Sequence, residues 1–236
     1  MLPPKQCLAK LSDKVILNEK YVQLKFEWVE PHLVQFQAGQ YLSVSIADLP
    51  DRRSYSLVSP PSNEHGFDLL VDLAPNGVGV KFLTGLEYGQ EMSCLVPIGI
   101  FTVPEKAVGK PLHFIATGSG IAPYRSIILD ELQNKNNTQP ITLYWGIREA
   151  NTLFWEDEFE ELMGSYPNFK FHPVVSRPPD SWPLCRGRVT DCLNTHALLP
   201  ESEYFICGGE VMVNDVTELL LGKGVSKDNI HREKFF

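Results

Sequence analysis

The sequence lacks the features that would mark a nucleic-acid-binding, disulfide-linked or membrane protein. Basic residues are outnumbered, with 21 Lys and Arg against 29 Asp and Glu, whereas binding of nucleic-acid phosphates needs clustered cations. The five cysteines and six histidines are scattered without a Cys-x-x-Cys pair, so we expect neither a disulfide framework nor a metal site. No apolar run approaches the roughly 20 residues of a membrane span, and no signal-peptide pattern begins the chain. We therefore expect a cytoplasmic protein.

What the sequence does contain is the composition of an ordinary globular protein. It has 236 residues, of which 43% are hydrophobic, and this length allows one large domain or two smaller ones with proper cores. The segment from Pro104 to Pro111 has the proline and glycine punctuation of a domain boundary. We expect a first domain over residues 1–106 and a second over residues 107–236.

The first half of the chain is rich in short segments that alternate apolar and polar residues. This period of two is typical of half-buried antiparallel strands, and their Gly, Pro and Asn boundaries predict a closed barrel or a sandwich. A short helix interrupts them, from about Gly79 to Leu86, and Gly89 follows its end. The predicted strands are residues 14–17, 21–28, 40–46, 66–73 and 90–96.

The second half alternates apolar strands with helical segments. Continuous apolar runs are typical of strands covered on both faces. The predicted strands are residues 112–117, 141–145, 169–175 and 204–207, and the predicted helices are residues 124–134, 151–163, 189–199 and 211–223. This alternation predicts a doubly wound parallel sheet with right-handed crossovers and helices on both faces.

The stretch Arg53-Ser54-Tyr55-Ser56 combines a cation, an aromatic ring and two hydroxyls. In an extended segment Arg53 and Tyr55 point one way, and Ser54 and Ser56 point the other. That arrangement would suit a flat ring bearing a phosphate. The alternative is an edge strand with an ordinary Arg and Tyr on its solvent side.

The residues Gly77, Val78, Gly79 and Val80 open the predicted short helix. The free N–H groups and positive dipole end of a helix start favour anions, and glycines let a pyrophosphate approach the backbone. The alternative is a hairpin loop that simply leads into a helix.

Three glycine-containing loops follow strands of the predicted parallel sheet. They begin at Gly118, Gly146 and Gly208. Ligands of such sheets bind beyond the carboxyl ends of the strands, where glycine lets a flat or charged group reach the backbone. The spacing Gly118-x-Gly120-x-x-Pro123 is not the Rossmann fingerprint, because proline replaces the third glycine and no acidic residue caps the second strand.

Five motifs, taken in order, resemble the ferredoxin–NADP reductase superfamily. They are Arg53-Ser54-Tyr55-Ser56, Gly77-Val78-Gly79, Pro97-Ile98-Gly99-Ile100-Phe101, the stretch from Thr117 to Pro123, and Cys207-Gly208-Gly209-Glu210-Val211-Met212. Tyr144-Trp145-Gly146-Ile147-Arg148-Glu149 also resembles the bacterial NAD(P)H:flavin reductases and oxygenase reductase components. The resemblance implies an N-terminal, antiparallel six-stranded flavin-binding barrel followed by the nucleotide-binding α/β domain.

The resemblance implies that the barrel binds FAD, with FMN the less favoured flavin. Tyr55 would pack on the isoalloxazine, Arg53 would pair with the flavin phosphate, and Ser56 would hydrogen-bond near flavin N5. The helix start from Gly77 to Gly79 would bind the pyrophosphate. Val80 stands where the family usually has Ser or Thr, and the missing hydrogen bond predicts FAD binding weaker by about 1 kcal/mol.

The second domain would bind NADH or NADPH. Cys207 would border the nicotinamide, whereas without the resemblance it is best interpreted as an inert core thiol. The resemblance assigns catalysis to Tyr55, Ser56, Cys207 and Glu233. Further predicted cofactor contacts are Thr117, Gly118, Gly120, Ile121, Pro123, Gly146, Arg148, Arg177, Gly208, Met212, Phe235 and Phe236.

The choice between NADH and NADPH depends on the segment after residue 175. In NADPH-using members of the family, a Ser-Arg pair such as Ser176-Arg177 often binds the 2′-phosphate. Asp180 would repel that phosphate, and the stretch from Arg186 to Arg188 resembles the NADH-using branch. We expect a slight preference for NADH.

The C-terminal Phe235 and Phe236 have two interpretations. In some reductases a C-terminal aromatic covers the flavin and moves when nicotinamide enters. The alternative is a last strand that ends in buried phenylalanines.

The resemblance implies hydride transfer from NAD(P)H to FAD and electron transfer onward to a separate acceptor, either ferredoxin, flavodoxin or an oxygenase. Two alternatives stay open: a flavin reductase that releases free reduced flavin, and a non-catalytic electron-transfer subunit of a larger complex. Nucleic-acid and membrane partners are not expected.

Overall fold

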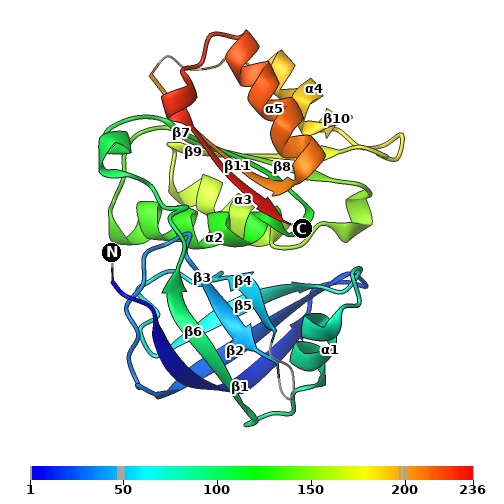
Figure 1. Cartoon of the computed structure of the whole chain (residues 1–236). Coiled ribbons are helices and arrows are strands. Elements are labelled where there is room, and N and C mark those ends of the chain that lie inside the picture. The colour runs from blue at the N-terminus through cyan, green and yellow to red at the C-terminus, as the bar shows by residue number, and fades with distance from the viewer. Residues whose placement is uncertain (1, 47–50, 197, 199–200, 236) are drawn as a thin grey trace. The chain divides into compact units, whose positions relative to one another are not determined.

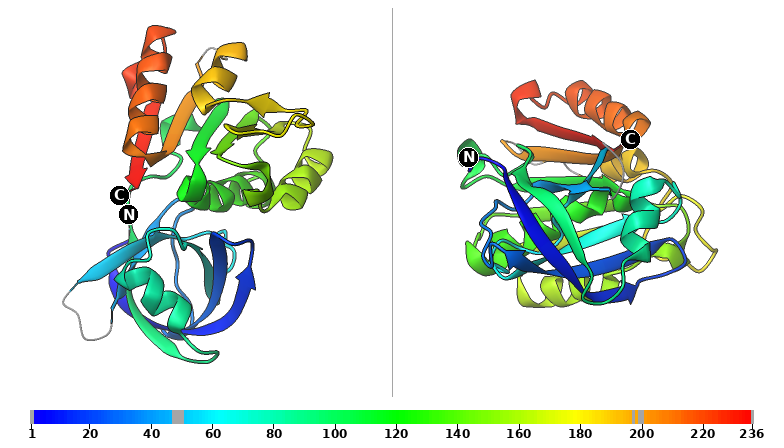
Figure 2. Two further views of the ribbon diagram at one scale, coloured as in Figure 1. Left: turned by 90° about the vertical axis from the view of Figure 1, so that its right-hand side faces the viewer. Right: turned by 60° about the horizontal axis from the view of Figure 1, so that its bottom comes forward.

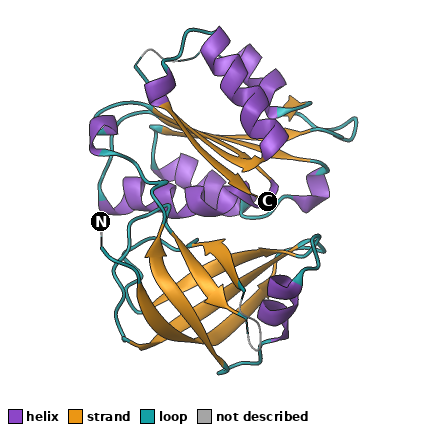
Figure 3. Cartoon of the chain, viewed as in Figure 1, coloured by secondary structure: helices purple, strands orange, loops and turns teal. Residues whose placement is uncertain are grey.

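Antiparallel strands dominate the first part of the structure, a computed structural model that describes residues 2–46, 51–196, 198 and 201–235. The chain divides into two units. The first contains residues up to 103 together with 122–135, and the second contains residues 104–121 together with those from 136 onward. Strands prevail in the first unit, whereas helices alternate with strands in the second (Figure 1, Figure 3). No described helix is both long and apolar enough to cross a membrane.

The first unit contains a six-stranded antiparallel sheet with the strand order β4-β3-β6-β1-β2-β5. A bridge between Leu57 and Leu69 connects the segment after β4 to β5, so the sheet closes on itself. The predicted antiparallel six-stranded barrel is thereby confirmed. Its strands are β1 (Lys5–Ile16), β2 (Tyr21–Glu30), β3 (Tyr41–Ser45), β4 (Arg52–Ser56), β5 (Gly66–Asp72) and β6 (Glu91–Ile98).

Strand β1 is much longer than the predicted segment 14–17. Cys7, Ala9 and Leu11 alternate into the barrel core and are almost fully buried. Two of these side chains are small, so the alternation is weak in the sequence. Pairing with β2 on one side and β6 on the other extends the strand.

Two helices belong to the first unit. Helix α1 (Val78–Gly85) matches the predicted short helix within one residue at each end and buries Leu83. Helix α2 (Ala122–Leu129) continues as a π-helical turn, Asp130–Asn134. It contacts the barrel, because the Ser126 hydroxyl donates to the Ser59 carbonyl over 2.7 Å.

The second unit contains a parallel sheet with the strand order β10-β9-β8-β7-β11-β12. Helix α3 packs on one face through Phe159, 5.0 Å from Phe171. Helices α4 and α5 lie side by side on the other face, where Cys192 and Val213 share a core cluster with Tyr144 (Figure 2). The predicted parallel sheet with helices on both faces is confirmed. The elements are β7 (Leu112–Thr117), β8 (Ile141–Ile147), α3 (Glu156–Ser165), β9 (Phe169–Val175), β10 (Cys185–Arg186), α4 (Val189–Thr195), β11 (Glu203–Gly209), α5 (Glu210–Gly222) and β12 (Ile230–Phe235).

Several predicted boundaries in this unit are wrong. Strand β8 continues through Gly146, and β11 through Gly208, so both glycines lie in strand ends and not in loops. Helix α3 begins five residues after its predicted start, because Trp155, just before the helix, has the left-handed φ of 56°. Helix α4 ends at Thr195, and residues 197 and 199 of the predicted helix lie outside the described residues.

Candidate functional site

In the first unit, β4 and the start of α1 meet at Gly79. A Cβ atom at Gly79 would lie 2.6 Å from Tyr55 Oη and 2.9 Å from Arg53 Cγ. Arg53 and Tyr55 therefore share one face of β4, as alternation along a strand requires. Only glycine leaves room for both side chains against the helix.

The two adjacent arginines of β4 are held differently. The Arg52 guanidinium donates to the hydroxyls of Ser43 over 3.2 Å and Ser45 over 2.7 Å, so it is tied to β3. The Arg53 guanidinium is largely exposed, 3.7 Å from the Asp51 carboxylate. Such an exposed ion pair contributes little to stability. Arg53 can therefore exchange it for an anionic ligand, whereas Arg52 positions the strand.

Tyr55 presents a half-buried ring between the barrel core and solvent. Burial raises the pKa of the Tyr55 phenol, although the Arg53 charge opposes this effect, so the ring stays neutral. Ser54 is exposed and Ser56 is buried. The strand thus offers an aromatic face beside an exposed guanidinium.

The start of α1 is open to an anion. No side chain caps the helix at Gly77, and its first turn holds no acidic residue. The first N–H groups of a helix lack partners within the helix and attract negative charge. Gly77 and Val78 are exposed, whereas Gly79 is buried and Val80 packs partly on the barrel core. Together with Arg53 and Tyr55, this arrangement fits a ligand that carries a flat ring and a pyrophosphate, as FAD does.

In the second unit, the turn after β7 lies against the carboxyl end of β11. A Cβ atom at Gly120 would lie 2.3 Å from the Cys207 carbonyl oxygen. One at Gly208 would lie 2.4 Å from Thr117 Oγ1 and 2.6 Å from Met212 Cε. The structure thus brings these five residues together, at the edge of the sheet where parallel-sheet ligands bind.

Cys207 and Glu233 are neighbours across the last two strands of the sheet, because β11 and β12 pair them in register. Cys207 is fully buried, and burial, with the Glu233 charge second, raises the pKa of its thiol well above the ordinary value. Burial also raises the pKa of the Glu233 carboxyl to about 7. This carboxyl can therefore hold or release a proton near neutral pH.

Two exposed arginines follow β8 and β9. The backbone N–H of Arg177 donates to the Arg148 carbonyl over 2.8 Å, so the two residues are adjacent. Gly146, just before Arg148, is packed so closely that a Cβ atom would lie 2.7 Å from Val189 Cγ1. The Arg186 guanidinium donates to the Asp180 carbonyl over 2.7 Å and shapes the following turn.

The remaining predicted residues have less distinctive surroundings. Gly118 has a left-handed φ of 54°, and its carbonyl accepts a hydrogen bond from Trp145 Nε1 over 2.9 Å. Ile121 is fully buried, and Pro123 is buried in the first turn of α2. Phe235 is half-buried at the end of β12, and Phe236 lies outside the described residues. The predicted site residues thus form two groups, and Pro123 belongs to the first unit.

The comparisons with known proteins match both units. Residues 8–103 match the oxidoreductase FAD-binding domain, and residues 114–218 match the oxidoreductase NAD-binding domain. The propane 2-monooxygenase reductase component of Gordonia sp. (strain TY-5) is 32% identical over 220 residues, which are 91% of this chain and 63% of that protein. The chain spans 63%, 60% and 58% of the lengths of three curated relatives, that protein included.

Two solved structures show the same architecture. Amycolatopsis cytochrome P450 reductase superimposes with a TM-score of 0.90 and 26% identity, over 99% of this chain and 70% of that chain. A ferredoxin NADP⁺ reductase from Neisseria gonorrhoeae, solved with bound FAD and NADP, has a TM-score of 0.82 and 23% identity over 100% of both chains, and shares the fold.

The chain thus contains an oxidoreductase FAD-binding domain followed by an oxidoreductase NAD-binding domain. With these two domains, the chain belongs to the ferredoxin–NADP reductase superfamily. The predicted family and the predicted cofactors, FAD with NADH or NADPH, are confirmed.

The close approach at Gly79 gives a direct test of the flavin half-site. We expect Gly79→Ala to weaken FAD binding roughly 5- to 30-fold, because overpacking of about 1–2 kcal/mol would displace Tyr55 and the Arg53 stem. Fluorescence titration of the flavin-free protein with FAD measures this change in Kd. Gly85→Ala, in the same helix, is the matched control, because its Cβ would meet nothing within 4 Å. Equal Kd values for the two variants would contradict this interpretation.

Proposed function

We propose that this chain takes hydride from NADH or NADPH onto FAD and passes electrons to a separate acceptor protein, either a ferredoxin, a flavodoxin or an oxygenase. The observation that carries the proposal is the meeting of Arg53, Tyr55 and the uncapped start of α1 around Gly79, within a domain of FAD-binding type. The similarity to reductase components of oxygenases supports an acceptor in trans.

The chain's own residues would bind and orient the flavin. When bound, FAD supplies the redox chemistry, because it takes two electrons as hydride and releases them singly. Arg53 would pair with its phosphate, and the N–H groups from Gly77 to Val80 would bind the pyrophosphate. Tyr55 would stack on the ring, and Ser54 and Ser56 would hydrogen-bond at its edge.

The second unit would orient the nicotinamide nucleotide. The turn from Thr117 to Ile121 would bind the pyrophosphate, and Cys207 and Gly208 would form the wall of the nicotinamide pocket. Glu233, beside Cys207, would hold a proton near neutral pH. Met212 and Gly146 would support this wall by packing. The covering of the flavin by Phe235 or Phe236 stays a prediction.

A flavin reductase that releases reduced flavin is the second candidate. It is favoured by Val80, which gives the first turn of α1 no hydroxyl. This residue leaves one fewer side-chain hydrogen bond available to hold a flavin permanently.

The absorption spectrum of the purified protein tests both candidates. Under the proposal, the protein retains FAD, and anaerobic NADH or NADPH bleaches the flavin absorption. A colourless protein that reduces added flavin would favour the second candidate. A protein that neither binds nor reduces flavin would contradict both.

We also propose that the functional domains divide at residues 106 and 107, and that the protein works in the cytoplasm. The ends of the two family matches, at residues 103 and 114, bracket the proposed boundary. All five cysteines are free thiols, which is the state that a reducing compartment maintains. Limited proteolysis between residues 103 and 114 would test the boundary.

Arg177, which lies beside Arg148, is the residue proposed to bind the 2′-phosphate of NADPH. We expect Arg177→Ala to lower the ratio of kcat/KM for NADPH to that for NADH about 10- to 150-fold, because a charge-assisted hydrogen bond contributes roughly 1.5–3 kcal/mol. Steady-state kinetics with both nucleotides measures the ratio. Lys223→Ala is the control, since Lys223 is an exposed cation at the end of α5. An unchanged ratio in Arg177→Ala would show that another residue binds the 2′-phosphate.

A further inference from the structure

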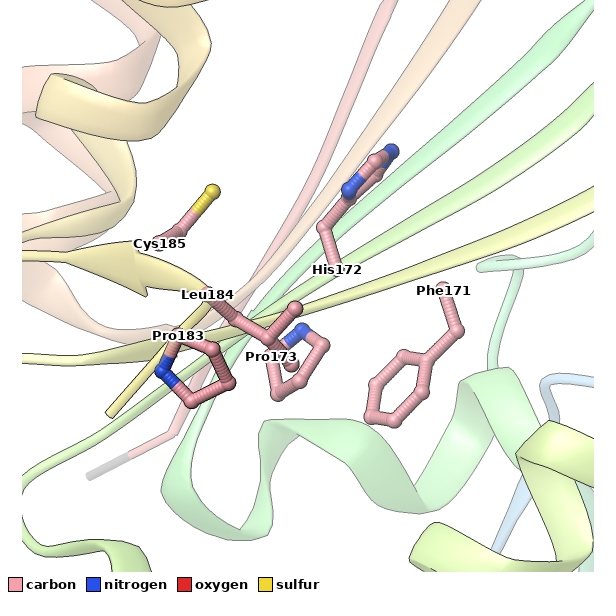
Figure 4. A pocket seen from close by; sticks show the side chains of 6 residues that line it. All are labelled: Phe171, His172, Pro173, Pro183, Leu184 and Cys185. Atoms are coloured by element: carbon pink, nitrogen blue, oxygen red, sulfur yellow. The ribbon is translucent and has the colours of Figure 1, made fainter. Parts of the chain in front are cut away.

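A cluster of metal-ligating side chains lies on the face of the parallel sheet that α4 and α5 cover. His172 on β9, Cys185 on β10 and His196 at the end of α4 bring their ligand atoms within 4.8 Å of one another. None of the three belongs to the predicted flavin or nicotinamide residues. Figure 4 shows His172 and Cys185 on one side of the strand and Phe171 on the other.

His196 is already oriented as a metal ligand would be. Its Nδ1 lies 2.8 Å from the backbone carbonyl of Cys192, and a carbonyl can only accept, so Nδ1 carries the hydrogen. The Thr195 hydroxyl, 3.3 Å from Nδ1, donates to the same carbonyl and is free to accept from the ring. Nε2 therefore keeps its lone pair. Histidines that bind metals are commonly fixed in this way, by a second-sphere carbonyl at the other nitrogen.

His172 is held beside it by ring contacts. Its ring stacks on Tyr144 at 5.1 Å and lies 4.5 Å from the His196 ring. In the described part of the chain, no hydrogen bond engages either of its ring nitrogens. The ring nitrogens of His172 are therefore available to bind a metal.

A second sulfur adjoins the cluster. Cys192 is 3% exposed, its Sγ lies 3.7 Å from His196 Nδ1, and its thiol is within hydrogen-bonding reach of Cys185. Imidazole nitrogens and cysteine sulfurs are the ligands that zinc prefers. In a tetrahedral site the ligand atoms lie about 3.3–3.8 Å apart, so the separations of up to 4.8 Å among His172, Cys185 and His196 need to close by roughly 1–1.5 Å, which side-chain rotation can supply.

An entry route for an ion is also present. A pocket reaches both His172 and Cys185 from the surface, where Pro183 and Leu184 are exposed. The pocket is lined by Phe171, His172, Pro173, Pro183, Leu184 and Cys185 (Figure 4).

We propose that His172, Cys185 and His196 form a binding site for a divalent transition metal of the Zn²⁺ class. Binding would release the Cys185 thiol proton to solvent as the metal–sulfur bond forms. The metal would join β9, β10 and α4, and so brace the two-residue strand β10 at the end of the turn that begins at Arg177.

Cobalt(II) substitution tests the site in the full, flavin-loaded protein under reducing conditions. After chelator treatment, we expect one Co²⁺ per chain, with a thiolate-to-cobalt charge-transfer band and tetrahedral d–d bands in the difference spectrum, all removed by Zn²⁺. Cys185→Ser and His196→Asn should each raise the Kd by more than about 100-fold, since even loss of a second-sphere partner costs roughly 10- to 100-fold. Cys7→Ser and His32→Asn, which lie in the barrel unit, are the matched controls.

Three outcomes would overturn the proposal. The first is a Co²⁺ affinity that neither variant changes, and the second is a spectrum without a thiolate band. The third is a Cys185–Cys192 disulfide, found by mass spectrometry, that persists when metal is supplied with reductant. If Cys185→Ser does not fold, His196→Asn decides alone, because His196 is half-exposed at the helix end. None of these results depends on NAD(P)H oxidation, so the site can fail while the proposed function holds.

Discussion

Replacing Gly120 with alanine is expected to slow NAD(P)H-dependent flavin reduction by about 100-fold or more. The added methyl would lie 2.3 Å from the Cys207 carbonyl oxygen, 2.7 Å from its carbonyl carbon and 3.1 Å from Gly208 Cα. All three are backbone atoms, so no side-chain rotation relieves the overlap, and the end of β11 must move away from the turn after β7. Misplacement of about 1 Å near a reacting centre is enough to produce a loss of this size.

Anaerobic stopped-flow measurement of flavin bleaching gives the rate for this comparison. Gly209→Ala is the matched control, because it lies in the same stretch and its Cβ would meet nothing within 4 Å. Chemical reduction by dithionite should bleach the flavin equally in both variants, since the barrel is untouched. Equal NADH-dependent rates in Gly120→Ala and Gly209→Ala would refute the assignment of this turn to nucleotide binding.

The second large effect concerns Glu233 and pH. Its carboxyl has a pKa of about 7 in the folded protein, raised by burial from an ordinary value of 4.5. The folded state therefore holds the proton more tightly than the unfolded state does. This contribution to stability is fully present below pH 4.5 and is lost as the pH rises through about 7. Relative to Glu233→Gln, which has no such proton, the wild type should lose on the order of 2–3 kcal/mol across this window.

Urea unfolding at several pH values, on the wild type and on Glu233→Gln, measures the difference in free energy of unfolding. The exposed Glu218→Gln is the control, and its curve should run parallel to that of the wild type. If Glu233→Gln also runs parallel to the wild type, the Glu233 carboxyl is ionised at neutral pH like an ordinary one. In that case it would not be the proton-holding group beside Cys207.

Much of the fold is encoded locally and could be predicted. The periods of two in the first half and the continuous apolar runs in the second depend on neighbours along the chain. The predicted bounds of the parallel strand β7 agree with the observed ones at both ends, because an apolar run flanked by proline and glycine leaves few alternative strand bounds. The glycines at residues 77 and 79 could be placed for the same reason, since a helix start with free N–H groups is recognisable from its sequence.

The functional site could not be predicted from local sequence patterns alone. Arg52 and Arg53 are equivalent in the sequence, and the hydrogen bonds of Arg52 to β3 are what separate a positioning residue from an available one. Gly146 looked like a loop residue, but it is a strand residue packed against Val189 of α4. In each case the deciding contact comes from a distant part of the chain.

The sequence by itself thus determined the two kinds of sheet, the order of the motifs and the local chemistry of each. Only the tertiary structure decided which distant residues meet. Parallel pairing of β11 with β12 sets Cys207 beside Glu233, and packing of α4 on the sheet sets His196 beside His172 and Cys185. The reason is physical: periodicity and turn preferences are properties of neighbouring residues, whereas strand register and helix packing follow from burial of side chains far apart in the chain.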